Sequence, residues 1–430
     1  MGGRLVLLNS VLTASPLYFF SIFRCPAWVL TKIDRIRRNF LWGSYQSFDK
    51  KKFCLVSWQI ITKQKEFGGW GILNLHHMNT ALLGKWIWKY HFKEHTSIWK
   101  SIVTSRYNSF DNTSTSSPLW KTLSRLKPLF NLGCKRIVGN GDNISFWNEV
   151  WLDNIPLSRT FPLLFNKTNK PKATISQVWN EGKVKLSLSR GISNPVRSKK
   201  TVVLNILNEL NLNSEKDSIF WNLDSRGFYS VRSLYSFLNN LGITCNLNHT
   251  VWPIKVPLKA KLLLWLILNN KILTLDNLQK KGWQGPNKCV FCDNLESVDH
   301  IFLNCPSASN FWTGFNLFND RGINLNFTNM SSIWFSINNL KSNDRAFTKA
   351  ILATWCSVVW NERNNMVFRD FKTNEHNHTI FRTLHLFLNW TGTSTGLAAN
   401  FRDLTALQNA ARRSERQDTS EGHVTDASSD

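Results

Sequence analysis

The amino-acid sequence predicts a mainly α-helical protein with a few short β-hairpins. Apolar residues recur at helical spacing in several segments, which indicates amphipathic helices. An asparagine–glycine turn signal between short extended stretches indicates a hairpin. The 430 residues are 42% hydrophobic and include 20 tryptophans and 29 phenylalanines, so the chain can form the cores of two or three domains.

Residues 5–23 are largely apolar, but polar residues interrupt the run and Arg24 follows it directly. These interruptions disfavour both a membrane span and a signal peptide. We therefore expect a buried helix in this segment and no membrane partner.

Residues 27–43 carry apolar residues at helical spacing and end at Gly43, which predicts a helix. The apolar positions are Val29, Leu30, Ile33, Ile36, Phe40 and Leu41. Lys32, Arg35 and Arg38 fall largely on the other side, and Lys50, Lys51 and Lys52 follow in a loop. These basic residues form either a solvated face or a surface that contacts the backbone phosphates of nucleic acid.

The glycines of Gly68-Gly-Trp-Gly71 fit neither a P-loop nor a dinucleotide-binding fingerprint, so we interpret them as turn residues. A helix follows, with apolar residues at Leu75, Met78, Leu82, Trp86 and Tyr90. Directly after it, His91-Phe-Lys-Glu94-His95 fits the H-x-x-E-H pattern of inverted zinc proteases. A catalytic site would also need a distant third ligand and a cleft, and nothing nearby indicates either. We interpret this match as chance.

Two hairpins are predicted further along the chain. Residues 134–147 contain the turn signal Asn140-Gly141, and Phe220 to Tyr229 form the second hairpin. Residues 167–215 are polar and rich in lysine, asparagine and serine, which indicates a loose domain boundary.

Pro257 stands at the first position of a predicted core helix, which includes seven consecutive apolar residues from Leu262 to Leu268. This helix is too short to span a membrane. Thr274 is predicted to cap the next short helix, which ends at Gly282. Lysines border the core helix and either contact phosphates or are solvated: Lys255, Lys259, Lys261 and Lys271.

A C-x2-C-x7-H-x4-C array follows, formed by Cys289, Cys292, His300 and Cys305. Thiolates and imidazole are the ligands that zinc prefers, and a structural site uses four of them. Ser297 is predicted to cap a short helix that presents His300, with Asp299 in its first turn. On a continuous α-helix, positions 300 and 305 would point well apart, but Pro306 biases Cys305 out of the helical conformation. We predict one structural zinc ion at these four residues.

Buried free cysteines, a disulfide or a redox C-x-x-C pair would each account for only part of the array. None of them accounts for the histidine and the third cysteine together, so structural zinc is favoured over all three. A catalytic zinc ion is disfavoured, because four protein ligands leave no position for water or substrate.

The chain has 53 lysines and arginines against 28 aspartates and glutamates, a formal net charge of +25. Such a charge attracts polyanions, nucleic acid above all, although an anionic membrane would also fit. The eight cysteines, three of them in the array, indicate a reducing intracellular compartment, nuclear or cytoplasmic, rather than a disulfide scaffold.

Several segments around the array carry a family resemblance. They are Gly227-Phe-Tyr-Ser-Val-Arg-Ser-Leu-Tyr235, Trp252-Pro-Ile-Lys-Val-Pro-Leu-Lys-Ala-Lys-Leu-Leu-Leu-Trp265, Asn270-Lys-Ile-Leu-Thr274, Glu296-Ser-Val-Asp-His300 and Phe311-Trp312. Together with the array, they resemble the reverse-transcriptase zinc-binding domain found near the C-terminus of plant LINE-type (non-LTR) retrotransposon polyproteins. Similar segments of the same family stand at Asn79-Thr-Ala-Leu-Leu-Gly-Lys-Trp86, Gly139-Asn-Gly-Asp142 and Trp360-Asn-Glu-Arg-Asn364.

The resemblance implies five consecutive parts. Residues 1–110 would form a helical region similar to the thumb that follows the palm of a LINE reverse transcriptase, and residues 111–215 a connecting region with a hairpin. Residues 216–320 would be a small α-helical zinc-binding domain, followed by C-terminal helices over 321–390. The polar segment 391–430, which is acidic over residues 415–430, is expected to be disordered.

The resemblance also implies binding to RNA or DNA, largely independent of sequence. Reverse transcriptases hold two magnesium ions with palm aspartates, normally including an Asp-Asp pair, and this chain contains no Asp-Asp pair. We therefore expect no polymerase activity from this chain alone. Endonuclease activity is not expected either, and ribonuclease H activity is not expected because the segment after residue 390 offers no set of carboxylates on a sheet. The hypothesis is a non-catalytic, zinc-containing nucleic-acid-binding remnant of a retrotransposon polymerase. The alternative is a zinc-stapled structural or protein-interaction module, and an enzyme is the least favoured class.

Overall fold

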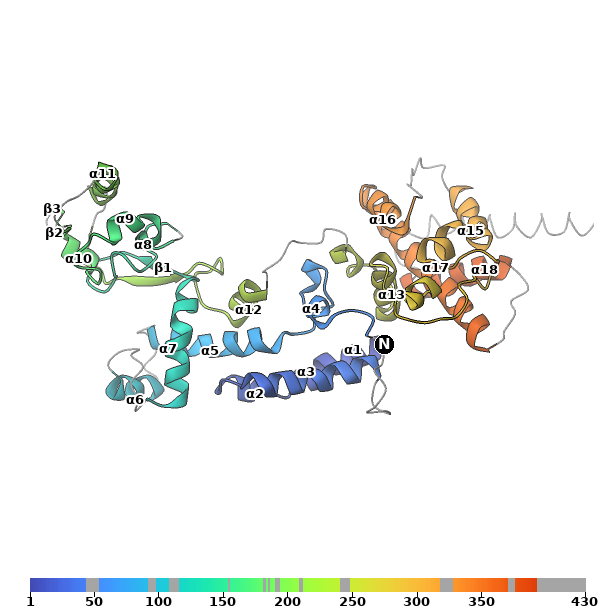
Figure 1. The fold of residues 1–430 in the computed structure, drawn as a ribbon, viewed down its shortest axis with the longest axis horizontal. Helices are drawn as coiled ribbons and strands as arrows, with labels where there is room; N and C mark the ends of the chain where they lie inside the picture. The colour runs from blue at the N-terminus through green and yellow to red at the C-terminus, as the bar shows by residue number, and fades with distance from the viewer. Residues whose placement is uncertain are drawn as a thin grey trace, which may run out of the picture. The chain divides into compact units, whose positions relative to one another are not determined.

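A computed structural model shows the elements of the fold (Figure 1). It describes residues 1–43, 54–91, 98–107, 116–153, 155–180, 183–184, 186–189, 194–208, 212–239, 248–317, 328–369 and 376–392. Helices dominate this part of the chain, and its named strands form two two-stranded antiparallel sheets. The predicted mainly α-helical fold with short β elements is therefore confirmed. No described helix is both long and apolar enough to cross a membrane.

The chain divides into two compact units that interleave along the sequence. Unit 1 comprises Met1–Ser10, Arg37–Ile72 and Gly242–Asp430, and unit 2 comprises Val11–Ile36 and Leu73–Leu241. Each of the four hydrophobic clusters lies within one unit. This division crosses the consecutive boundaries expected from the sequence, and the five-part organisation itself stays a prediction.

Unit 1 is built around α13 (Leu258–Leu268), which packs against α16 (Met330–Asn338) and α17 (Ser342–Arg369). Most of its apolar side chains, among them Leu264 and Trp265, are buried as predicted. The other elements are α1 (Gly2–Leu7), α4 (Trp58–Ile61), η2 (Lys65–Phe67), η3 (Asn248–Val251), α14 (Leu275–Gln279), η4 (His300–Asn304), α15 (Pro306–Leu317) and α18 (His376–Thr391). Two elements continue from one unit into the other, η1 (Leu8–Leu12) and α3 (Ala27–Trp42).

Unit 2 is built around α5 (Leu75–His91), the helix predicted after the glycine turn, which packs against α7 (Pro118–Asn131) and α12 (Val231–Asn239). Tyr229 fixes α5 by donating a hydrogen bond to the carbonyl oxygen of Ala81. A Cβ at Gly84 would lie 2.6 Å from the hydroxyl oxygen of Tyr229, so this contact requires glycine. The remaining helices are α2 (Leu17–Phe20), α6 (Ile98–Arg106), α8 (Leu157–Thr160), α9 (Pro162–Phe165), α10 (Ile175–Val178) and α11 (Asn194–Asn208).

The sheets differ from the two predicted hairpins. β1 (Cys134–Ile137) pairs antiparallel with β4 (Ser218–Trp221), far away in sequence, and the local hairpin is β2 (Trp179–Asn180) with β3 (Lys183–Val184). Asn140-Gly141 does make a turn, but the backbone N–H groups of Gly139 and Gly141 both donate to Oδ1 of Asp217 at 2.8 Å. The carboxylate before β4 thus draws the loop toward β4 instead of letting residues 134–147 pair with themselves.

Two expectations for the N-terminal region are wrong. Residues 5–23 form three short helical pieces rather than one buried helix, and several of their apolar side chains are exposed, including Tyr18 and Phe19. The helix over 27–43 is confirmed as α3. Ile36, which the pattern placed among the apolar positions, is exposed, whereas Arg37 is fully buried. Arg37 lies over the ring of Trp58, at 5.3 Å from its centroid, which gives the guanidinium an aromatic partner in place of water.

Candidate metal centre

The structure brings the four predicted zinc ligands together. The ligand atoms of Cys289, Cys292, His300 and Cys305 all lie within 4.8 Å of one another. The sulfurs of Cys292 and Cys305 are 3.8 Å apart, and the Cys292 sulfur is 3.2 Å from Nε2 of His300. Tetrahedral ligands at about 2.3 Å from zinc lie about 3.8 Å from each other. The four residues therefore form a potential single zinc-binding site, as predicted.

A helical turn wider than an α-helix brings His300 and Cys305 to the same ion. The N–H of Cys305 donates to the carbonyl oxygen of His300 at 2.7 Å, which makes residues 300–304 a π-helix. An i→i+5 bond closes a wider turn than that of an α-helix. Here the side chains of residues 300 and 305 reach the same site, whereas a continuous α-helix would point them well apart. Cys305 itself has an extended conformation, with φ −68° and ψ 138°, as expected before Pro306.

The beginning of the array is fixed by a tight turn and a side-chain cap. The N–H of Cys289 donates to the carbonyl oxygen of Asn294 at 2.8 Å, which closes the turn that carries Cys292. The hydroxyl of Ser297 accepts from the N–H of His300 at 3.1 Å, so the predicted cap is confirmed.

The thiols share protons unequally. A hydrogen bond from Cys305 lowers the pKa of Cys289 to about 5. The same bond, together with burial, raises the pKa of Cys305. Cys289 therefore favours the thiolate form. Cys305 would lose its proton on binding zinc, because a metal-bound thiol is deprotonated.

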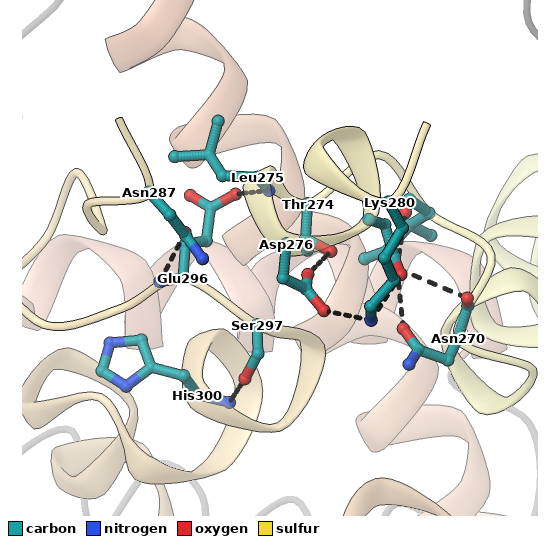
Figure 2. Close-up of polar contacts among 11 residues, drawn as sticks. Asn270, Thr274, Leu275, Asp276, Lys280, Asn287, Glu296, Ser297 and His300 are labelled. Atoms are coloured by element: carbon teal, nitrogen blue, oxygen red, sulfur yellow. Dashed lines mark hydrogen bonds and ion pairs between the residues drawn. The ribbon is translucent and has the colours of Figure 1, made fainter. Parts of the chain in front are cut away.

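Carboxylates next to the array hold the surrounding helices instead of binding metal. Glu296 accepts a hydrogen bond from the N–H of Leu275 at 2.8 Å, at the start of α14 (Figure 2). It also forms a fully buried ion pair with Arg363 of α17 at 2.8 Å. Asp299 accepts from the N–H of Met330 at 2.8 Å and so caps α16. Both carboxylates are therefore capping or supporting groups for the helices around the array.

The segment that carries the ligands also contacts the start of α14. Thr274 is the first residue before the helix, as predicted, but its hydroxyl donates to the carboxylate of Asp276 rather than accepting from the helix (Figure 2). Glu296 supplies the cap instead. The N–H of Glu296 in turn donates to the side chain of Asn287 at 3.0 Å. Glu296 thus connects the start of α14 with Asn287 of the loop before the array.

The structure places the predicted basic residues in different settings. Lys32, Arg35, Lys255, Lys259 and Lys271 are exposed, and Arg38 is half-buried. Lys261 is half-buried and donates from Nζ to the carbonyl oxygen of Trp252 at 2.7 Å, so it has a structural contact. Lys50, Lys51 and Lys52 lie outside the described residues, as do Glu94 and His95 of the H-x-x-E-H match. Nucleic-acid binding by all these lysines and arginines stays a prediction.

Sequence reasoning did not find Arg363 as the partner of the carboxylate beside the array. The signal was present in Trp360-Asn-Glu-Arg-Asn364, which the family resemblance had singled out without a role. Phe311 and Trp312 similarly gain roles: Phe311 stacks on Trp355 of α17, with ring centroids 3.8 Å apart, and Trp312 donates to the carbonyl oxygen of Phe302 at 2.8 Å.

Residues 229–312 match the family described as zinc-binding in reverse transcriptase. This match includes all four candidate ligands and lies within the predicted segment 216–320. The chain therefore contains a reverse-transcriptase zinc-binding domain, which confirms the resemblance found from the sequence.

The chain is also similar to a protein of Arabidopsis thaliana that is named, provisionally, as a ribonuclease H protein. The two are 26% identical over 337 residues, which cover 72% of this chain and 51% of the relative. The chain thus spans about half the length of this curated relative. Taken together, the two matches support a retrotransposon-related zinc-binding protein.

Proposed function

We propose that this chain binds RNA or DNA without catalysing a reaction, as part of a LINE-type reverse transcriptase. The excess of positive charge carries the proposal: the formal net charge is +25, and five of the predicted basic residues on α3 and around α13 are exposed. Backbone phosphates are the polyanions that such lysines and arginines contact without reading sequence.

In this proposal, the zinc site stabilises the fold. Three thiolates and one imidazole complete a tetrahedral zinc site and leave no position for a substrate or a water nucleophile. The neighbouring carboxylates extend that role, because Glu296 and Asp299 tie the ligand segment to α14, α16 and α17. When bound, zinc would cross-link the four ligands. The contacts of Glu296 and Asp299 would connect this cross-linked segment to the helices of unit 1.

Fluorescence anisotropy with a structured RNA and a DNA duplex tests the proposal, with zinc-loaded and chelator-treated protein over a salt series. We expect affinity to fall steeply with salt, with the logarithmic slope on DNA decreasing by about 0.9 for each phosphate contact removed. Lys32→Gln with Arg35→Gln tests α3, and Lys259→Gln with Lys271→Gln tests the border of α13. Absence of binding to either nucleic acid at low salt would refute the proposal.

A specific observation favours a second function, protein interaction. Four large side chains in and beside α2 and at the start of α3 are strongly exposed: Tyr18 71%, Phe19 61%, Phe23 61% and Trp28 69%. Contiguous exposed apolar residues often mark interaction surfaces. Association with a protein partner that is insensitive to salt and lost in Phe19→Ser with Trp28→Ser would favour this function.

A further inference from the structure

A pocket in unit 1 lies apart from the zinc ligands. Its volume is about 460 Å³, and it is lined by residues from η3, α16, α17 and α18 and from the segment before α13. Pockets of about 300–1,000 Å³ are the usual size for small ligands or ligand groups. The polar side chains considered below are His249, Lys255, Asn338, Ser342, Arg345 and Lys349.

The pocket has an uncompensated positive charge. Lys255, Arg345 and Lys349 line it, His249 adds an imidazole, and no aspartate or glutamate stands among the lining residues that the structure describes. Only one of the three, Lys255, was predicted from the sequence as a phosphate contact. The fold therefore adds two cationic side chains of α17 to a lysine that precedes α13.

Lys349 is the most informative of these groups. The residue is 8% exposed, and its ammonium lies 5.0 Å from the centroid of the Trp334 ring. Among the described residues it has no hydrogen-bond or ion-pair partner, and burial together with the nearby charge of Arg345 lowers its pKa to about 8. A buried ammonium without an anionic partner is costly for a fold, and an anion in the pocket would remove that cost.

The start of α17 adds to the same field. Ser342 is the first residue of this 28-residue helix, and it lines the pocket together with Arg345 from the next turn. The N-terminus of a helix carries partial positive charge and favours anions. Arg345 also donates to the carbonyl oxygen of Asn338 at 3.2 Å, which fixes its guanidinium at the pocket wall.

We propose that this pocket binds a phosphate group. Several cations around one cavity suit an anion with several oxygens and more than one negative charge, and a guanidinium binds such an anion with paired hydrogen bonds. The source of the phosphate rests on the function proposed above. In a complex with RNA or DNA, the pocket holds a terminal or backbone phosphate of the strand.

Isothermal titration calorimetry of the full chain with inorganic pyrophosphate tests the pocket itself. Lys349→Met removes the ammonium and keeps an unbranched side chain, and Arg345→Gln and Lys255→Gln each remove one charge. We expect each of the first two variants to bind pyrophosphate about tenfold more weakly or worse. Lys341→Gln is the matched control, since Lys341 is exposed and does not line the pocket. Binding that is absent in the wild type, or equal in Lys341→Gln and Lys349→Met, overturns the proposal.

Oligonucleotides identify the source of the phosphate. A short single strand is compared with and without a 5′-phosphate, in competition with pyrophosphate. Competition that Lys349→Met abolishes shows that a strand phosphate enters the pocket. Pyrophosphate binding without such competition overturns the assignment to a nucleic-acid strand and leaves a free phosphate compound as the ligand. If the chain binds no nucleic acid at all, the proposed function fails, while the pyrophosphate titration still decides the pocket. Because Lys255 is exposed, its variant reports on the pocket even if Lys349→Met or Arg345→Gln fails to fold.

Discussion

Arg363 and Glu296 are 67 positions apart in sequence and form a bidentate ion pair in the interior of unit 1. The guanidinium donates at 2.8 Å to Oε1 and at 3.2 Å to Oε2, and the two side chains are 3% and 0% exposed. Glu296 also accepts from the N–H of Leu275. One carboxylate therefore connects the zinc segment with both α14 and α17.

Removing one partner of this pair should destabilise unit 1 strongly. Arg363→Met leaves a buried carboxylate without its counter-ion, which typically costs about 3–5 kcal/mol. The double variant Glu296→Gln with Arg363→Met should lose much less than the sum of the two single variants, because it leaves no unpaired buried charge and Gln still accepts from Leu275. Urea unfolding measures all of these free energies.

An exposed pair in unit 2 is the matched control for this cycle. Arg226 is paired with Asp224 at 3.2 Å, but its side chain is 75% exposed. Arg226→Met should leave the free energy of unfolding nearly unchanged, because solvent screens such pairs. Similar losses for Arg226→Met and Arg363→Met would show that burial of the Glu296 pair has no special consequence.

Loss of one zinc ligand should loosen one region and leave the other unit folded. Cys292→Ser should lower the zinc content from one ion per chain and increase amide hydrogen exchange over residues 280–312, since binding and local folding are coupled. Exchange in the α5–α12 region of unit 2 should not change. Cys54→Ser is the control, because Cys54 is an exposed cysteine outside the array. Uniform loss of protection along the whole chain would contradict the prediction.

The sequence predicted features whose signals lie close together in the chain. The helices α3, α5 and α13 have an apolar pattern or an apolar run within one segment, and the ligand spacing identified the candidate zinc site. The conformation of Cys305 followed from its neighbour Pro306. In each of these cases, the residues that decide the outcome are close neighbours in the sequence.

Features that depend on distant partners were missed. The pairing of β1 with β4 depends on Asp217, whose carboxylate meets a loop more than 70 residues earlier. Arg37, which the helical pattern assigned to neither face, is buried beside Trp58. The π-helix was also missed, since the wider turn is stabilised by the i→i+5 bond and not by a residue preference that can be read from the sequence.

The contact between Asp217 and the glycine loop gives a third prediction. Asp217 accepts three backbone N–H groups, from Gly139, Gly141 and Asn143, each at 2.8 Å. Asp217→Ala should leave these donors without their partner and cost about 1–3 kcal/mol or more. Gly139→Ala should also destabilise unit 2, because its Cβ would lie 2.3 Å from the carbonyl oxygen of Glu215. Thermal unfolding of the full chain measures both effects, and Gly3→Ala, which adds a Cβ where no atom lies within 4 Å, is the control.

The buried ammonium of Lys349 should make the stability of unit 1 rise with pH. Its pKa in the fold is about 8, below the ordinary value of 10.5, because of burial and the charge of Arg345. Below pH 8 the lysine is charged in both states, so the cost of burying the charge is fully present. Between about pH 8 and 10.5 the unfolded chain binds more protons than the fold, so the free energy of unfolding increases with pH over this range.

Urea unfolding from pH 7 to 10 measures this contribution as the difference between the wild type and Lys349→Met. The variant should be the more stable protein at pH 7, and its advantage should shrink as the pH rises through 8 toward 10. Pyrophosphate should reduce the advantage at pH 7 as well, because an anion in the pocket stabilises the charged lysine of the wild type. A difference that is constant over this pH range would show that Lys349 is as well solvated in the fold as in the unfolded chain.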